Sequence, residues 1–154
     1  MSWDKSLIIE QLDRMLEKLP SASEVPVYKR GWIYTLRNAI GMSARSLGER
    51  IGVNQSSITK LEKNESNKGI TLRSLERAAE GLDYELVYYF KPKRGSLKLT
   101  VESRARSKVI RELNMLNVHM ALEDQEVEKA ELANMVENDV KDLIRTMPKE
   151  LWDD

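Results

Sequence analysis

The sequence predicts a mainly α-helical fold with a single short β-strand. In seven segments the apolar residues recur every three or four positions, which is the pattern of amphipathic helices. Only 7 glycines and 4 prolines occur among the 154 residues, so helices are seldom interrupted. One run, residues 84–90, is instead rich in aromatic and β-branched residues and is followed by Pro92, which favours a strand.

The seven expected helices have recognisable ends. They cover residues 3–19, 31–40, 43–51, 54–64, 71–82, 101–121 and 126–147. Gly41 ends the second helix, and Gly52 supplies a tight exit from the third. Ser43, Asn54 and Thr71 are the expected N-caps of the third, fourth and fifth helices, because their short polar side chains accept hydrogen bonds from free backbone N–H groups.

Composition excludes several classes of site. The chain has no cysteine, which excludes disulfides, thiolate zinc ligands and thiol nucleophiles. The first residues lack the apolar core of a secretory signal, and no stretch approaches the length of a membrane span. We therefore expect a cytoplasmic protein without a cofactor or a metal site.

Charge is distributed unevenly over three predicted parts, although the whole chain has 25 basic and 25 acidic residues. Residues 1–28, an N-terminal helix and linker, carry 3 basic against 5 acidic residues. Residues 29–94 carry 13 against 7, and residues 95–154, a two-helix extension, carry 9 against 13. The positive excess falls in the middle part, which is where we expect a phosphate backbone to bind.

Residues 43–64 have the pattern of a helix-turn-helix unit. Two short helices that cross at a steep angle need a small residue where they touch and a glycine in the turn, and Gly48 and Gly52 meet these needs. The apolar residues expected between the helices are Leu47, Ile51, Val53, Ile58 and Leu61. A plain helical hairpin would use the same apolar residues, so the outward face of the second helix decides between the two interpretations.

That outward face suits the major groove of DNA. The residues predicted to contact base edges are Gln55, Ser56, Thr59 and Lys60, with amide, hydroxyl and ammonium groups, and Glu62 is the only acid expected nearby. The residues predicted to contact phosphates are Ser43, Arg45, Asn54, Lys63, Asn64 and Lys68. Arg45 and Lys68 would serve equally well as solvated surface charges. Residues 29–94 are thus the expected DNA-binding domain.

The predicted strand has no partner strand within the chain. A lone strand leaves its backbone groups unpaired, and the same strand from a second copy would pair with it across a two-fold axis. The sequence therefore predicts a homodimer. The expected dimerisation residues are Tyr84, Leu86, Val87, Tyr88, Tyr89 and Phe90.

Residues 41–62 resemble the helix-turn-helix of the phage-repressor (XRE) class. In that class the residues that match Gln55, Ser56 and Lys60 commonly face bases, whereas Ala44 departs from the glutamine that many members have. The resemblance implies a lambda-repressor-like helix-turn-helix bundle, here with a C-terminal strand and extra flanking helices. It also implies a sequence-specific transcriptional regulator.

A wider resemblance links the chain to the mobile mystery protein A family. The shared features are an N-terminal helix, the Gly-Trp-Ile entry at 31–33, the helix start at 41–45, the strand at 84–88, the segment at 119–125 and the ending at 151–153. This resemblance implies a dimeric repressor that autoregulates a mobile-element operon. The alternative that it implies is an antitoxin-like protein that binds and neutralises a Fic-domain partner encoded by the adjacent gene.

Two alternatives concern the C-terminal part. An enzyme would have to rely on acidic pairs or on His119, which lies in a helical run where a packed histidine is the expected role. The apolar stripe of the extension comprises Val109, Ile110, Leu113, Met120, Val136, Val140 and Ile144. It could bind a partner, but we expect it to pack the helices on each other or to extend a dimer interface.

Overall fold

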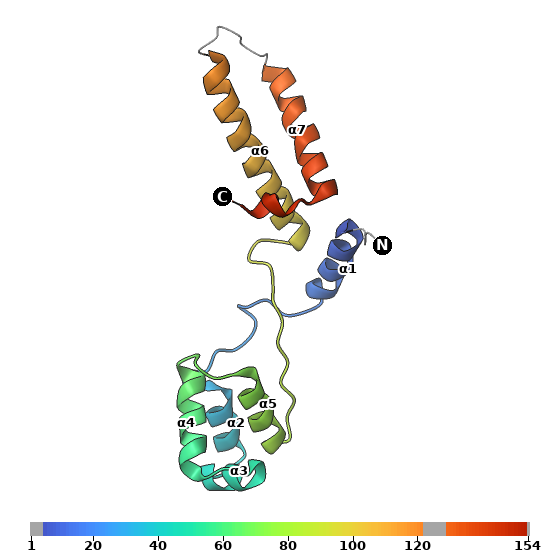
Figure 1. Cartoon of the computed structure of the whole chain (residues 1–154). Coiled ribbons are helices and arrows are strands. Elements are labelled where there is room, and N and C mark those ends of the chain that lie inside the picture. Colours follow the sequence, from blue (N-terminus) through green and yellow to red (C-terminus); the bar gives the residue numbers. More distant parts are fainter. Residues whose placement is uncertain (1–4, 122–128, 154) are drawn as a thin grey trace. The chain divides into compact units, whose positions relative to one another are not determined.

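The computed structural model describes residues 5–121 and 129–153, and for residues 117–121 it describes the backbone alone. The chain separates into two compact units, each built of helices (Figure 1). One unit is residues 21–90, and the other combines residues 1–20 with residues 91–154. Within the described residues, no helix has both the length and the apolar character that crossing a membrane requires.

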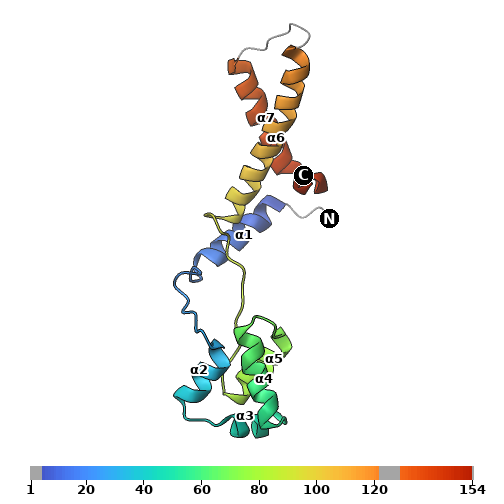
Figure 2. The ribbon, with the colours of Figure 1, turned by 90° about the vertical axis from the view of Figure 1, so that its left-hand side faces the viewer.

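The unit of residues 21–90 is a bundle of four helices. They are α2 (Gly31–Ala39), α3 (Ala44–Ile51), α4 (Gln55–Ser66) and α5 (Leu72–Gly81), and α3 lies across the end of α4 (Figure 2). The three predicted N-caps are confirmed. Ser43 accepts a hydrogen bond from the Ser46 N–H at 3.0 Å, Asn54 accepts one from Ser57 at 2.8 Å, and Thr71 accepts one from Ser74 at 3.2 Å.

The core of this unit confirms the expected packing between α3 and α4. Its buried residues are Ile33, Leu47, Ile58, Ala78 and Leu82, and Ile51, Val53 and Leu61 pack against them. Gly48 is the small contact residue, because a Cβ atom there would lie 2.5 Å from the carbonyl oxygen of Val53. Gly52 has φ of 73°, a left-handed conformation that favours glycine in the turn.

The prediction of a β-strand at residues 84–90 is wrong. The segment is not helical, but neither it nor any other part of residues 5–121 and 129–153 forms a strand. Its half-buried side chains are Leu86 and Tyr89, three residues apart, whereas a strand would turn every second side chain to one face. Aromatic and β-branched composition favours an extended backbone, but a strand also needs a hydrogen-bonded neighbour, and none is described within the chain.

The second unit joins the two ends of the chain. It contains α1 (Lys5–Glu17), α6 (Leu97–Ala121), α7 (Lys129–Thr146) and a short 3-10 helix, η1 (Lys149–Trp152), and α6 and α7 lie side by side and antiparallel (Figure 1). The buried core residues are Val101, Ala105, Val109, Leu113, Val140 and Leu151, with Ile9, Val136 and Ile144 among those packed against them. Most of the predicted apolar stripe therefore packs inside this unit, while Ile110 is 42% exposed.

Polar contacts tie distant parts of this unit together. The Asp13 carboxylate on α1 accepts hydrogen bonds from the backbone N–H groups of Leu97 at 2.7 Å and Lys98 at 3.0 Å, and so caps the start of α6. Arg104 on α6 donates to the carbonyl oxygens of Leu151 and Asp153, each at 2.8 Å. These bonds hold α1 and the C-terminal segment against α6.

Some predictions concern positions outside this description. The expected starts of the first and last helices at Trp3 and Glu126 lie outside the described residues. The side chains of His119 and Met120 also lie outside the description. Of the segment at 119–125, only the backbone of residues 119–121 is described, as part of α6.

A pH titration tests the link between α6 and α7. The Arg106 guanidinium donates to the Glu137 carboxylate at 2.7 Å; this hydrogen bond, and then the attraction between the charges, lowers the pKa of Glu137 and raises the pKa of Arg106. The full stabilisation from this pair is therefore present at pH values above the pKa that Glu137 has in the unfolded chain. It is lost as the pH falls through the lower pKa that Glu137 has in the folded state.

We expect the Glu137 carboxylate to titrate at lower pH in the wild type than in Arg106→Gln, as measured by carboxyl ¹³C chemical shifts. The exposed Arg111→Gln on the same helix is the control and should leave the midpoint of Glu137 unchanged. Identical midpoints in the wild type and Arg106→Gln would contradict the prediction.

Candidate nucleic-acid interface

The exposed face of α4 carries the four predicted base-contact residues. Gln55, Ser56, Thr59 and Lys60 are all exposed, and their spacing places them along one side of the helix. The Ser56 hydroxyl donates to the Asn54 side chain at 2.9 Å, and the Thr59 hydroxyl donates to the Gln55 carbonyl at 3.3 Å. Within the described part of the chain, the Gln55 amide and the Lys60 ammonium make no hydrogen bond or ion pair. These two long side chains are therefore available to an external ligand.

The predicted phosphate-contact residues lie around this face. Ser43 and Asn54 are exposed at the N-termini of α3 and α4, where free backbone N–H groups and the helix dipole favour an anion. The six residues comprise these two caps together with Arg45, Lys63, Asn64 and Lys68. Lys63 and Lys68 are exposed, and Asn64 is half-buried. The Arg45 guanidinium donates to the exposed Glu49 carboxylate at 2.9 Å.

Glu62 does not lie on this face, contrary to the sequence-based expectation. It is buried, and its carboxylate accepts a hydrogen bond from the Arg37 guanidinium of α2 at 2.6 Å. Arg37 is buried as well and also donates to the Met42 carbonyl at 2.8 Å. The charge of Glu62 is therefore neutralised inside the bundle, and Lys60 and Lys63 dominate the outward side of α4. The local signal was only that Glu62 lies four residues after the buried Ile58, while its partner Arg37 is 25 positions away in the sequence.

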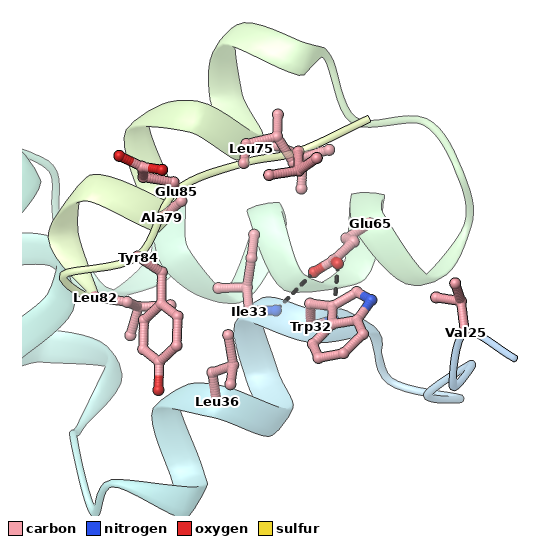
Figure 3. A pocket seen from close by; sticks show the side chains of 12 residues that line it. Val25, Trp32, Ile33, Leu36, Glu65, Leu75, Ala79, Leu82, Tyr84 and Glu85 are labelled. Atoms are coloured by element: carbon pink, nitrogen blue, oxygen red, sulfur yellow. Dashed lines mark hydrogen bonds between the residues drawn. The ribbon is translucent and has the colours of Figure 1, made fainter. Parts of the chain in front are cut away.

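Glu65 is a further functional residue that sequence reasoning missed. Its carboxylate accepts hydrogen bonds from the backbone N–H groups of Trp32 at 2.7 Å and Ile33 at 2.9 Å, and so caps the N-terminus of α2 (Figure 3). Gly31 permits this approach, because a Cβ atom there would lie 2.6 Å from the Glu65 carboxyl carbon. The carboxylate thus faces the dipole of α2 and not the surface of α4.

An open apolar groove lies elsewhere on this unit. It has a volume of about 360 Å³ and is formed by α2, α5 and the segment after α5, with Trp32, Leu36, Leu75 and Tyr84 among the lining residues (Figure 3). Of the predicted dimerisation residues, Leu86 and Tyr89 are half-buried. The others are exposed, namely Tyr84, Val87, Tyr88 and Phe90.

Comparison with known proteins identifies one part of the chain. Residues 33–89, from the first turn of α2 to the segment after α5, match a family model described as Helix-turn-helix. Neither the curated proteins nor the solved structures include a match to the chain.

A pair of variants tests how Arg37 and Glu62 hold α4. Arg37→Met leaves the Glu62 charge buried without a partner, and we expect it to lower the free energy of unfolding of this unit by about 3–5 kcal/mol. The double variant Arg37→Met/Glu62→Leu replaces the pair with apolar groups and should regain most of that loss. Urea unfolding followed by Trp32 fluorescence, in a Trp3→Phe/Trp152→Phe background, measures this unit. Equal stability of the single and double variants would contradict the assignment.

Proposed function

We propose that the chain is a DNA-binding transcription regulator that reads its operator with the exposed face of α4. The match of residues 33–89 to the helix-turn-helix family, of the XRE type, supports this proposal. This family consists of DNA-binding regulatory domains and not of enzymes. The regulator acts where the operator is, which we propose to be the cytoplasm.

The observation that carries this proposal is the chemistry of α4. Its side chains at Gln55, Ser56, Thr59 and Lys60 are exposed, and its acids Glu62 and Glu65 are bonded to α2. In the major groove an amide can pair with both N6 and N7 of adenine, and an ammonium can reach O6 and N7 of guanine. We propose that Gln55 and Lys60 make these contacts and that the two hydroxyl groups read neighbouring base edges.

Phosphates are proposed to bind around this face and to fix its register. Ser43 and Asn54 would present the N-termini of α3 and α4, while Lys63, Asn64 and Lys68 would bind the strand beside the C-terminal end of α4. Arg45 is held by Glu49 in an exposed pair, and such pairs contribute little free energy. Arg45 can therefore exchange Glu49 for a phosphate at small cost.

We propose that the regulator is a homodimer. One helix-turn-helix reads only a short site, whereas the two copies in a dimer read two half-sites on one side of the duplex. The exposed apolar side chains after α5 support this proposal. Val87, Tyr88 and Phe90 are 73%, 62% and 87% exposed, next to a groove that contains Trp32. Apolar clusters of this kind mark interaction surfaces. The contact would form through side chains and not through a shared strand.

Repression is the proposed mode of regulation, since a dimer seated on an operator blocks access to that DNA. Autoregulation of a mobile-element operon and binding of a Fic-domain partner rest on the resemblance to mobile mystery protein A. The family match at residues 33–89 does not extend to that resemblance. Neutralisation of a Fic-domain protein therefore stays a prediction.

DNA binding by α4 can be tested with two substitutions. Gln55→Ala and Lys60→Ala should each cost about 1–3 kcal/mol of discrimination between the operator and a scrambled duplex, because each removes a contact to base edges. Fluorescence anisotropy with DNA from upstream of the protein's own gene measures this difference. Gln11→Ala and Lys141→Ala, exposed residues of the other unit, are matched controls. If both α4 variants discriminated as well as the wild type, the assignment of the exposed face of α4 as the face that contacts bases (the reading face) would be refuted.

The proposed dimer makes a separate prediction. Val87→Asp/Phe90→Asp places charges in the apolar contact, so we expect a monomeric mass by analytical ultracentrifugation at micromolar concentration. Binding to a single half-site should persist, while tighter binding to two half-sites should be lost. Leu99→Asp, at an exposed apolar position of the other unit, is the control and should remain dimeric. A wild-type monomer under these conditions would refute the dimer.

A further inference from the structure

Arg30 has a pre-organised cationic side chain at the start of α2. It is exposed, and its guanidinium carbon lies 3.5 Å from the centroid of the Tyr34 ring. Stacking on an aromatic face restricts the guanidinium plane but leaves its N–H groups, which lie in that plane, able to donate. The Arg30 side chain is thus held in place by a contact that does not consume its hydrogen-bond donors.

The side of α2 that carries Arg30 neighbours the reading face of α4. Tyr34 and Arg37 are three residues apart on one side of α2, and the Arg37 guanidinium carbon lies 5.5 Å from the centroid of the Tyr34 ring. Arg30 precedes α2 across Gly31, whose φ is 82°, so its stacking on Tyr34, and not helical spacing, places its guanidinium in the same row. At the inner end of this row, Arg37 is bonded to Glu62 of α4, and Glu62 is three residues after Thr59 on the adjoining side of that helix. Arg30 and Tyr34 therefore lie along the edge of α2 that flanks the base-reading side chains.

Contacts one turn further along α4 also bring the start of α2 close. The Glu65 carboxylate bonds to the N–H groups of Trp32 and Ile33, so the residues that follow Arg30 rest on the last turns of α4 (Figure 3). Lys68 follows within one turn, where its N–H donates to the Glu65 carbonyl at 2.9 Å. Glu62 and Glu65 are both bonded to α2, while Arg30, Lys63 and Lys68 are exposed, so the charges that these five residues leave exposed are positive.

We propose that Arg30 binds a phosphate of the DNA strand bordering the major groove that α4 reads. The planar fork of a guanidinium matches the geometry of phosphate oxygens, and an arginine already ordered by Tyr34 loses little freedom on binding. This contact extends the phosphate-binding surface from α3 and α4 to α2. The inference rests on the proposed operator binding by α4.

A salt titration tests this assignment. Each phosphate contact adds about 0.9 to the slope of log affinity against log salt concentration, so Arg30→Ala should lower the magnitude of that slope by about 1. It should weaken binding to the operator and to a scrambled duplex by the same factor, because a phosphate contact carries no base preference. Tyr34→Leu keeps the charge and removes the stacking, so it should weaken binding while the slope stays near the wild-type value.

Controls separate the possible failures. Arg111→Ala makes the same change in net charge on α6 and should leave both slope and affinity unchanged. An unaltered thermal transition of Trp32 fluorescence in Arg30→Ala would show that the bundle is intact. If the transition is altered, Arg30→Gln serves as the second variant. If both Arg30 variants keep the wild-type salt slope while the wild-type protein discriminates the operator, the phosphate contact of Arg30 is overturned and operator binding by α4 is not. Absence of operator discrimination in the wild type overturns the proposed function itself.

Discussion

The buried ion pair between Arg37 and Glu62 is the interaction on which the position of α4 depends. Both residues are buried, and the Arg37 guanidinium also bonds to the Met42 carbonyl in the turn before α3. Two charges removed from water must stay together, because separating them leaves the Glu62 carboxylate without its cation and the Arg37 guanidinium with the Met42 carbonyl alone. The pair therefore fixes one register of α4 against α2, whatever its net contribution to stability. A helix that reads bases needs such a fixed register, since its side chains must meet base edges at hydrogen-bonding distance.

Glu65 extends the same constraint by one turn. Because Glu62 and Glu65 are three residues apart, they share the side of α4 that faces α2, and each bonds to that helix. One arrangement thus has two consequences, as it orients the helix and removes both acids from the outward side. The charge of the exposed face of α4 therefore depends less on the count of basic residues than on where the acids of this helix are held.

The sequence predicted most of what depends on local signals and missed what depends on distant partners. The bundle and its caps at Ser43, Asn54 and Thr71 follow from periodicity and from short-range hydrogen bonds, and the exposure of residues 55, 56, 59 and 60 follows from the burial of Ile58. The burial of Glu62 depends on a residue 25 positions away, and the cap by Glu65 on one 33 positions away. Such pairs are fixed only when the helices have packed.

The segment after α5 shows why composition alone misassigned a strand. Its residues favour an extended backbone, yet Leu86 and Tyr89 are half-buried at a spacing of three, while Val87, Tyr88 and Phe90 are exposed. A strand ladder would set the register of two copies residue by residue. A contact made by apolar side chains fixes register through the shapes of those side chains instead. In a dimer of this kind, the distance between the two reading helices would depend on how a few aromatic rings pack against the groove.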